Sequence, residues 1–423
     1  MIHNVKNIIL NGELKDYRSP HKQMRIFAYK KYKRARDILS IAYNVFNLEK
    51  FIKKEEFLNV KIGRFLDAHS SELSDLLSEL ISYVLLEKIN FEFYNSDKRF
   101  YRKDYDFDLK KKTNAIVLFS GGIDSLAGIF WAKKYFKRIT GVFCAHSDQA
   151  WSINTVNKLS EKYLSKNNID LKTMHVPKIQ KGGYSQLRGF LYILSAGVWL
   201  DILDLDTIVL SECGPTMYQP RFGPYDNVTM TTHPVVVEIA KRVLETILEK
   251  KIKIVLPFEN MTKAEVISYI PDELIISKTH SCVSQRFGTH DGTCYGCVIR
   301  RLGSLASNRK DVHYDRNPIL DAGANSDNLL SLLLFSQDIL LNYRSMPLYQ
   351  VENIMSFNKF NLFERFALDN FTAVYSLISQ GIKPIDAVQG IYNEYIELKG
   401  INSLEKRIYD LRNKNFQINK KTA

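Results

Sequence analysis

The sequence contains few cysteines and no long apolar run. Five cysteines in 423 residues is a small, odd number, which argues against a disulfide framework. No stretch of about 20 uninterrupted apolar residues occurs, so we expect no membrane-spanning helix. The first residues lack a long apolar core with a small-residue cleavage site, so we expect no secretion signal. These absences together favour a protein of the reducing cytoplasm.

The composition is otherwise that of an ordinary globular protein. Apolar residues make up 45% and charged residues 25% of the chain, and this length suggests two or three domains. The net charge is +13, with basic residues crowded at 30–36, 110–112 and 406–421. Such charge attracts nucleic acid or acidic protein surfaces. A solvated lysine-rich surface explains it equally well, because the basic runs contain no recognisable nucleic-acid motif.

The segment Asn114–Ser125 lacks the Gly-x-x-x-x-Gly-Lys-Ser/Thr spacing of the common nucleotide loop. It reads Asn-Ala-Ile-Val-Leu-Phe-Ser-Gly-Gly-Ile-Asp-Ser, which predicts an apolar strand, a turn and the start of a helix. Gly121 and Gly122 allow close approaches that a Cβ would block. The free N–H groups of the helix start favour phosphate. Further candidate contacts are the hydroxyls of Ser120 and Ser125, and Asp124 as a metal ligand or helix cap.

The chain divides into three parts. Residues 1–110 form a mixed N-terminal extension with helical patterns at 22–46 and 71–88. Residues 111–310 alternate strand and helix, which predicts an α/β fold with a doubly wound parallel sheet. Ligands of such sheets bind at the carboxyl ends of the strands. Residues 311–423 look helical, which we interpret as structural packing. The expected strands are 115–119, 139–145, 171–176, 207–210 and 252–256, and the expected helices are 124–136, 152–166, 185–203, 235–250, 329–343, 362–379 and 385–397.

Three of the five cysteines lie within 16 residues of one another. Cys282 precedes the pair Cys294-Tyr-Gly-Cys297, and this spacing predicts a tetrahedral zinc site. A structural zinc contributes roughly 10 kcal/mol or more to folding, so its loss would unfold this region. Nothing in the pattern indicates a vacant coordination position, and we therefore interpret the metal as structural. Buried free thiols are the alternative.

The Ser-Gly-Gly-x-Asp-Ser motif resembles the pyrophosphate loop of the PP-loop ATP pyrophosphatases, which share the adenine nucleotide alpha hydrolase-like fold. Together with Ser-Cys, Cys-x-x-Cys and the following arginines, it resembles the 7-cyano-7-deazaguanine synthase (QueC) family over about 113–310. That family's zinc motif is Cys-x8-Cys-x2-Cys-x2-Cys. Counted from Cys282, its second position falls on Asp291. The fourth ligand is then Asp291 or the neighbouring His290.

The resemblance implies an ATP-dependent C–N ligase that forms AMP. Its substrate would be a carboxylated deazapurine such as 7-carboxy-7-deazaguanine, with Mg²⁺ on the phosphates and Zn²⁺ in the cysteine cluster. The product would be an amide or a nitrile, and the amine would be ammonia or a group on a partner macromolecule. The long chain is also similar to the QatC-like proteins of anti-phage operons. That similarity implies protein partners from the same operon.

Several polar side chains follow the expected strands or begin the expected helices. For each of them we consider a role in binding or catalysis and, as the alternative, a purely structural role. Arg188 suits a phosphate or carboxylate, and relatives place a basic residue near it. His146 could touch adenosine or metal, Glu212 could bind a guanine-like edge, and His233 could act as a base. Arg300 could meet phosphate or substrate carboxylate. The alternatives are surface, loop or packing residues.

Two rival functions remain open at this point. A tRNA-modifying enzyme would use the same loop to adenylate a base, and the positive charge favours it. No cysteine pair near the expected cleft supports sulfur transfer, because Cys144 and Cys213 lie on separate segments. A non-catalytic scaffold subunit of a defence complex is the other rival, and the intact loop motif argues against it.

Overall fold

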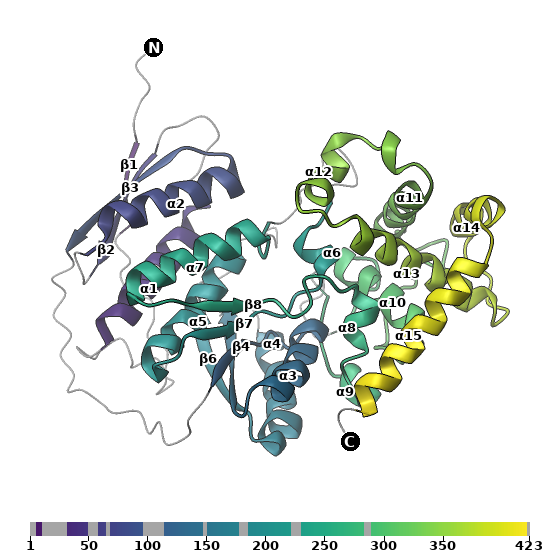
Figure 1. Cartoon of the computed structure of the whole chain (residues 1–423), viewed down its shortest axis with the longest axis horizontal. Helices are drawn as coiled ribbons and strands as arrows, with labels where there is room; N and C mark the ends of the chain where they lie inside the picture. The colour runs from purple at the N-terminus through teal and green to yellow at the C-terminus, as the bar shows by residue number, and fades with distance from the viewer. Residues whose placement is uncertain are drawn as a thin grey trace, which may run out of the picture.

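Two parallel β-sheets and the helices between them organise the chain (Figure 1). The computed structural model describes residues 6–10, 32–49, 58–64, 68–95, 114–146, 150–176, 185–220, 230–282 and 289–420. The larger sheet has the strand order β6-β5-β4-β7-β8, and all its strand pairs are parallel. Its strands are β4 (Ala115–Leu118), β5 (Ile139–His146), β6 (Asp170–Val176), β7 (Thr207–Val209) and β8 (Lys253–Val255).

The five strands of the larger sheet confirm the expected doubly wound α/β fold. Every residue of β4 and β5 is buried, as in parallel sheets covered on both faces. Alternate strand residues pack into different cores: Ile116 and Val142 face one helix layer, and Val117 and Phe143 face the other. The strand order reverses at β4, which lies between β5 and β7. The loop after β4 is therefore at the switch point where such sheets bind ligands.

Helices cover both faces of the larger sheet. On one face, α5 and α7 share a core with the N-terminal region, and on the other, α3, α4 and α8 form a second core. A π-turn and a 3₁₀ turn extend α4 as far as Asn167. The helices of this part are α3 (Ile123–Tyr135), α4 (Ala150–Leu159), α5 (Arg188–Leu203), α6 (Gly214–Met217), α7 (Pro234–Leu248), α8 (Lys263–Ile267), α9 (Glu273–Ile276) and α10 (Tyr295–Ala306).

The N-terminal region adds a three-stranded parallel sheet that the sequence analysis did not predict. Its order is β1-β2-β3, with β1 (Lys6–Leu10), β2 (Leu58–Arg64) and β3 (Ile89–Asn95). The two expected helices are confirmed as α1 (Lys33–Leu48) and α2 (Ser70–Leu85), although residues 22–31 lie outside the described chain. Helix α1 packs along α5, and α2 packs along α7. The N-terminal region is thus joined to the larger sheet through two helix layers (Figure 1).

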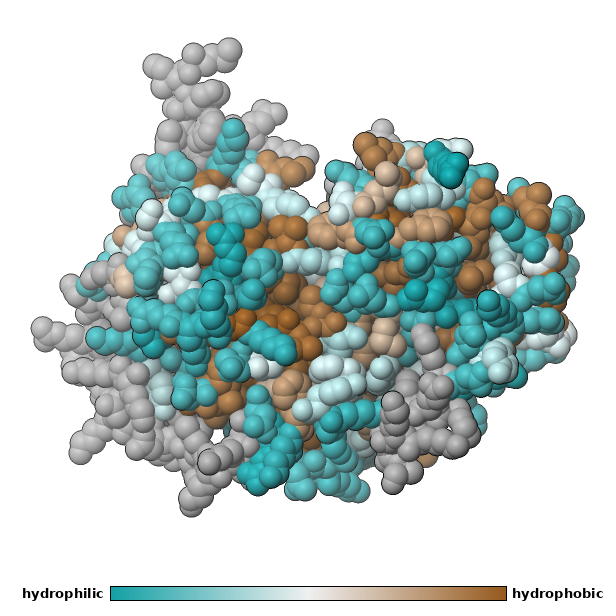
Figure 2. Space-filling model, viewed as in Figure 1, coloured by the Kyte–Doolittle hydropathy of each residue, from teal (hydrophilic) through white to brown (hydrophobic). Residues whose placement is uncertain are grey.

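The C-terminal region is helical, as expected, and shares a core with α8 and α10. Its exposed apolar side chains on α12 include Leu348, 68% exposed, and Met355, 57% exposed, and Figure 2 shows apolar residues gathered at this edge. Among the described residues, no helix is long and apolar enough to span a membrane. The C-terminal helices are α11 (Asp327–Leu341), α12 (Leu348–Ser356), α13 (Phe360–Ile378), α14 (Asp386–Lys399) and α15 (Asn402–Lys420), with a 3₁₀ turn at Tyr343–Ser345.

Candidate active site and metal cluster

The loop between β4 and α3 is closed by its own serines. The Ser125 hydroxyl donates to the carbonyl of Gly122 (3.0 Å) and accepts from the backbone N–H of Ser120 (3.2 Å). The two serine hydroxyls are 3.1 Å apart. Within the described residues, the backbone N–H groups of Ile123 and Asp124 have no acceptor, as expected for a helix N-terminus. Such amides, at the positive end of the 13-residue helix α3, suit an anion.

Gly121 is the conformationally demanding residue of this loop. Its φ is +79°, and a Cβ there would lie 2.8 Å from Cγ2 of Val156 on α4. A side chain at this position is therefore excluded by both backbone angle and space. The carbonyl of Gly121 accepts the backbone N–H of His280 at 3.0 Å. The loop is thereby tied to the segment that leads into the cysteine cluster.

Asp124, on the first turn of α3, lies in a buried polar cluster. Its Oδ2 accepts from Lys263 Nζ (2.5 Å) and from the backbone N–H of Cys213 (3.3 Å). Its Oδ1 is buried and has no hydrogen-bond partner. One ligand atom each of Asp124, Glu212 and Cys213 lies within 4.8 Å of the others. The ends of β4 and β7 therefore converge on one site, as the sequence predicted.

The charges of this cluster influence one another. Burial, followed by the charge of Asp124, raises the pKa of Glu212 to about 8. Burial opposes the charged form of Lys263, but Asp124, Cys213 and Glu212 outweigh it and raise the pKa of that amine above its usual value. Burial also raises the pKa of Cys213 to about 12. The site thus holds a charged lysine that contacts Asp124, and beside them Glu212, a carboxyl group that is readily protonated.

Lys263 is a site residue that the sequence analysis missed. It is the first residue of α8, directly after the N-cap Thr262. Thr262 and Glu265 form a capping box at the start of this helix. The Thr-Lys-Ala-Glu segment of the sequence therefore indicates a helix start at this position. Side-chain contact with Asp124 could not be inferred from that segment alone.

Arg188 begins α5 and lies near the carboxylate cluster. It is half-buried; burial raises the pKa of both Glu212 and Glu49, and the charge of Arg188 opposes this rise only slightly. Within the described chain its side chain has no hydrogen bond or ion pair. The N-terminal region supports this helix start, because the backbone N–H of Leu187 donates to Glu49 Oε1 at 2.8 Å. The guanidinium is therefore available to an anionic ligand near Glu212.

Two histidines that the sequence analysis considered for the site, His146 and His233, contact aromatic residues. His146 ends β5, is buried, and lies 2.7 Å (Nε2 to oxygen) from the Tyr192 hydroxyl on α5. Its ring also approaches Phe46 of α1, so it points into the α1–α5 layer rather than toward Asp124. Its contact with nucleotide or metal stays a prediction. The neighbouring Asp148 lies outside the described residues.

His233 caps α7 and lies inside an aromatic cluster. Its Nδ1 accepts from the backbone N–H of Val235 (3.4 Å) and lies 2.9 Å from the Tyr83 hydroxyl. Burial lowers the pKa of His233 to about 4, so the ring is neutral at physiological pH. Tyr218 and Phe357 pack against it at ring-centroid distances of 6.0 and 5.0 Å. This environment favours a structural role over the base function considered from the sequence.

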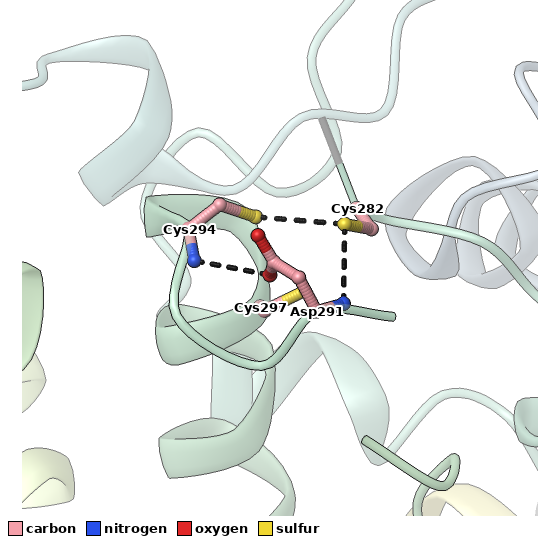
Figure 3. A group of neighbouring side chains, drawn as sticks. All are labelled: Cys282, Asp291, Cys294 and Cys297. Atoms are coloured by element: carbon pink, nitrogen blue, oxygen red, sulfur yellow. Dashed lines mark hydrogen bonds between the residues drawn. The ribbon is translucent and has the colours of Figure 1, made fainter. Parts of the chain in front are cut away.

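The three cysteines expected to bind metal come together with Asp291 (Figure 3). One ligand atom from each of Cys282, Asp291, Cys294 and Cys297 lies within 4.8 Å of the others. The sulfurs of Cys282 and Cys294 are 3.8 Å apart. Tetrahedral zinc with Zn–S bonds of about 2.3 Å requires sulfurs about 3.8 Å apart. The donor types and their spacing therefore fit a closed tetrahedral metal site.

The structure distinguishes the two candidates for the fourth ligand. Asp291 lies in the group, and its Oδ1 accepts the backbone N–H groups of Thr293 (3.0 Å) and Cys294 (3.1 Å). His290 lies outside the group, and its Nε2 accepts from the backbone N–H of Ser281 (3.2 Å). Burial lowers the pKa of His290 to about 4. A three-cysteine, one-aspartate set is the arrangement that the geometry supports.

Arg300 contacts groups of the fold itself. Its side chain is fully buried, and Nε forms an ion pair with Asp311 at 2.7 Å. Its Nη atoms donate to the carbonyls of Ile276 (2.9 Å) and Thr279 (3.1 Å) and to the Ser281 hydroxyl. These internal partners use the guanidinium and favour a structural role, and the substrate contact stays a prediction. Arg300 fixes the 276–281 segment that holds the Gly121 carbonyl.

Comparison with known proteins agrees with this geometry. The family model "Queuosine biosynthesis protein QueC" matches residues 145–307, a range that contains Glu212, Lys263 and the metal cluster. A curated relative, "7-cyano-7-deazaguanine synthase" of Clostridium botulinum (strain Langeland / NCTC 10281 / Type F), is 21% identical over 218 residues. The match covers 46% of this chain and 95% of the relative. The closer assignment to the QatC-like subgroup stays a prediction. Residues 145–307 are therefore similar to the QueC family, and the parallel sheet flanked by helices is consistent with a PP-loop fold.

Proposed function

We propose that the chain transfers AMP from ATP to the carboxylate of a carboxylated deazapurine and then joins the activated carbon to an amine. The observation that carries the proposal is the site around Asp124. Unpartnered helix amides face the loop at the switch point, and a buried, unpartnered Asp124 oxygen lies beside Glu212 and Lys263. This combination suits a polyphosphate and its cation.

The chemistry divides into two displacements. A substrate carboxylate oxygen attacks the α-phosphorus, the bond between the α-phosphorus and the bridging oxygen breaks, and pyrophosphate leaves. The amine nitrogen then attacks the activated carbonyl carbon, AMP leaves, and the nitrogen loses a proton to a base. Formation of a nitrile would require a second ATP to remove the amide oxygen. The enzyme contributes mainly positioning and charge stabilisation.

The described residues suggest a role for each part of the site. The amides of the Ser120–Ser125 loop would receive the leaving pyrophosphate. Arg188 would bind the substrate carboxylate or the α-phosphate, because its guanidinium has no protein partner within the described chain. Mg²⁺ held by Asp124 Oδ1 and Glu212 would neutralise phosphate charge. Beside Asp124, Glu212 is better placed for that task than for the edge of the purine.

The cysteine cluster has a structural role in this proposal. We assign it to Zn²⁺, because three thiolates and one carboxylate leave no open position and the sulfur spacing matches tetrahedral zinc. Its ligands lie on the segment that, through His280, binds the carbonyl of Gly121. The metal would therefore stabilise the phosphate loop without contacting the reactants.

The decisive experiment incubates the protein with Mg²⁺-ATP, 7-carboxy-7-deazaguanine and ammonia. AMP and pyrophosphate are measured together, and mass spectrometry identifies an amide or a nitrile. We expect AMP only when the acid is present. Parallel reactions with a protein amine in place of ammonia test the macromolecular acceptor. If no AMP forms with any deazapurine acid tried, the proposed AMP transfer is refuted.

Two glycine variants provide a matched control for this assay. Gly121→Ala should abolish AMP formation, because the new methyl group meets Val156 at 2.8 Å and the φ of +79° disfavours alanine. Gly390→Ala on α14 adds a methyl group with nothing within 4 Å and should keep full activity. Equal activity of the two variants would show that the loop does not bind the reacting phosphates.

A further inference from the structure

Cationic side chains of the C-terminal helices hold the segment that carries Lys263. Lys359, next to the start of α13, donates to Glu259 Oε1 (2.8 Å) and Asn260 Oδ1 (2.7 Å). Arg365 on α13 donates to the carbonyl of Asn260 at 2.7 Å. Residues 259–260 lie three and two positions before Thr262, the N-cap of α8. The backbone leading to Lys263 is thus bound from outside the QueC-like domain.

Glu265 is the point where two arginines converge. Its Oε1 accepts from Arg365 Nε (3.1 Å) and from Arg407 Nη2 of α15 (3.0 Å). Arg407 also pairs with Asp369 of α13 at 2.6 Å. The side chains of Glu265, Asp369 and Arg407 are at most 4% exposed. Buried charges of this kind are tolerated only with close partners, so the network holds its members in one arrangement.

The network reaches Lys263 through a very short helix. Helix α8 has five residues and begins at Lys263. Glu265 Oε2 accepts the backbone N–H of Thr262 (3.2 Å), and the Thr262 hydroxyl accepts that of Glu265 (3.3 Å). An isolated helix of this length has no stability of its own. The orientation of its first residue therefore depends on the capping box and on what fixes Glu265.

The stem of Lys263 has little freedom on its other side. A Cβ at Gly303 of α10 would lie 2.8 Å from Lys263 Cγ. The stem is therefore pressed against α10 while its amine contacts Asp124 at 2.5 Å. A small movement of α8 would carry the amine away from Asp124, because the stem cannot readily compensate.

We propose that Arg365 and Arg407 are positioning residues: through Glu265, the C-terminal helices hold α8 where the Lys263 amine contacts Asp124. The catalytic consequence rests on the proposed function, whereas the placement of Lys263 can be tested without it. In the sequence these helices looked like structural packing. Their contacts with Glu265 instead give these helices a role in positioning Lys263.

The direct test measures the exposure of the Lys263 amine. Full-length protein and the variants Arg407→Gln and Arg365→Gln are treated briefly with acetic anhydride, and acetylation of the Lys263 peptide is read by mass spectrometry. Buried and paired in the native protein, Lys263 should react slowly. Each variant should raise its labelling rate about tenfold, which corresponds to about 1.4 kcal/mol of opening free energy. If Arg407→Gln does not fold, the labelling of Arg365→Gln decides the test. The Arg365 side chain is 33% exposed, so we expect its replacement to leave the protein folded.

A second buried arginine–aspartate pair provides the matched control. Arg64 and Asp37 form an ion pair at 3.1 Å in the N-terminal region, with side chains 2% and 0% exposed. Arg64→Gln should lower stability without raising Lys263 labelling above the native rate. Unchanged labelling in folded Arg365→Gln and Arg407→Gln would overturn the proposal. Equal labelling in all three variants would also overturn it, because the effect would then be general loosening.

Kinetics separate positioning from the reaction itself. The kcat for AMP formation should fall about tenfold in Arg407→Gln, with the KM for ATP changed less than about threefold. Adding Arg407→Gln to Lys263→Met should cost nothing further, because the arginine acts through the lysine. Fully additive losses would contradict this link. If the native protein makes no AMP while the variants still expose Lys263, the proposed function fails and the positioning role stands.

Discussion

Asp124 is a buried carboxylate with only one of its two oxygens hydrogen-bonded. Removing an ionised carboxylate from water costs several kcal/mol even after the protein relaxes. Lys263 offsets that cost at Oδ2, but the same lysine also has to balance Glu212, whose carboxyl group lies beside Asp124. The arrangement is therefore incomplete as a structural ion pair. It makes physical sense as a site that receives a cation or a polar ligand group.

Replacing Lys263 tests this reasoning. Lys263→Met keeps the length of the stem but leaves Asp124 uncompensated, and we expect a loss of about 3–5 kcal/mol in the free energy of unfolding. Lys250→Met removes the surface partner of Asp204 and should change it by less than about 0.5 kcal/mol. Urea unfolding measures both variants. Similar small losses would indicate that Asp124 is solvated in the native protein.

The pH dependence of stability reports on Glu212. Its pKa is raised from the ordinary value of 4.5 to about 8 in the folded state, so the native protein binds one proton more than the unfolded chain between these values. Stability contributed by this group is then full below about pH 4.5 and is lost as pH rises toward 8. Glu212→Gln should flatten that decline in urea unfolding series from pH 5 to 8. The exposed Glu238→Gln should leave the slope as it is, and an equal change in both would contradict the assignment.

Residue types and spacing predicted part of this site. The alternation of strands and helices predicted a ligand site at the carboxyl ends of the strands, and Asp124 and Glu212 lie together there. His146 ends β5 at the same edge of the sheet, but its side chain points toward Tyr192 of α5 and away from Asp124. The internal partners of Arg300 were not foreseen, because a sequence does not show how many backbone carbonyls surround a guanidinium. Lys263 was missed because its contact joins residues 139 positions apart.

At the scale of elements, the metal cluster and the phosphate loop form one unit. Arg300 fixes the 276–281 segment, and His280 in that segment donates to the Gly121 carbonyl. The cysteine cluster holds both ends of the next stretch, because Cys282 follows this segment and Cys294 caps α10. Disorder introduced at the cluster should therefore spread to the loop.

Removal of the metal tests that coupling. We expect the purified protein to contain one zinc per chain by elemental analysis, and chelation or Cys294→Ser to lower both Tm and affinity for ATP. A structural zinc contributes about 10 kcal/mol or more, so its loss should unfold this part of the chain. Cys144→Ala removes a buried thiol outside the cluster and should keep both the zinc and ATP binding. Full ATP affinity in a zinc-free protein would show that the loop does not depend on the cluster.

The strands of the larger sheet were predictable because each is a short apolar run between turn residues and helical patterns. The smaller sheet was missed although Asn59–Arg64 alternates partly exposed and buried residues in the period of a strand. Basic side chains within such a short strand, here Lys61 and Arg64, weaken the apolar pattern. Helix α15 was not singled out within the helical C-terminal part, because its apolar residues are few and an arginine, Arg407, is buried beside Leu404 and Leu411. Burial of charge is a tertiary property that periodicity does not reveal.

At the scale of the molecule, the flanking regions complete the central domain. Tyr83 of α2, His233 of α7 and Phe357 after α12 meet in one aromatic cluster. This cluster links α2 and the start of α7 with the residue that follows α12. Buried residues of α1 and α2 share a continuous core with α5 and α7. The boundaries at 110 and 310 stay predictions about the chain, but the hydrophobic cores extend across both.

A chain shortened to residues 111–310 should therefore fail to fold cooperatively. Without α1 and α2, large apolar side chains of α5 and α7 such as Phe190 and Val236 would face water, and without α13 and α15 the charge of Glu265 would lose both arginines. Each exposed large apolar side chain forfeits about 1.5–3 kcal/mol, and a domain has only about 5–15 kcal/mol of net stability. The shortened chain should give a broad, non-cooperative urea transition and weak near-UV circular dichroism, whereas the full chain should unfold sharply. A sharp transition in the shortened chain would mean that the central sheet is an independent domain, and the flanking helices would then be attachments rather than parts of its core.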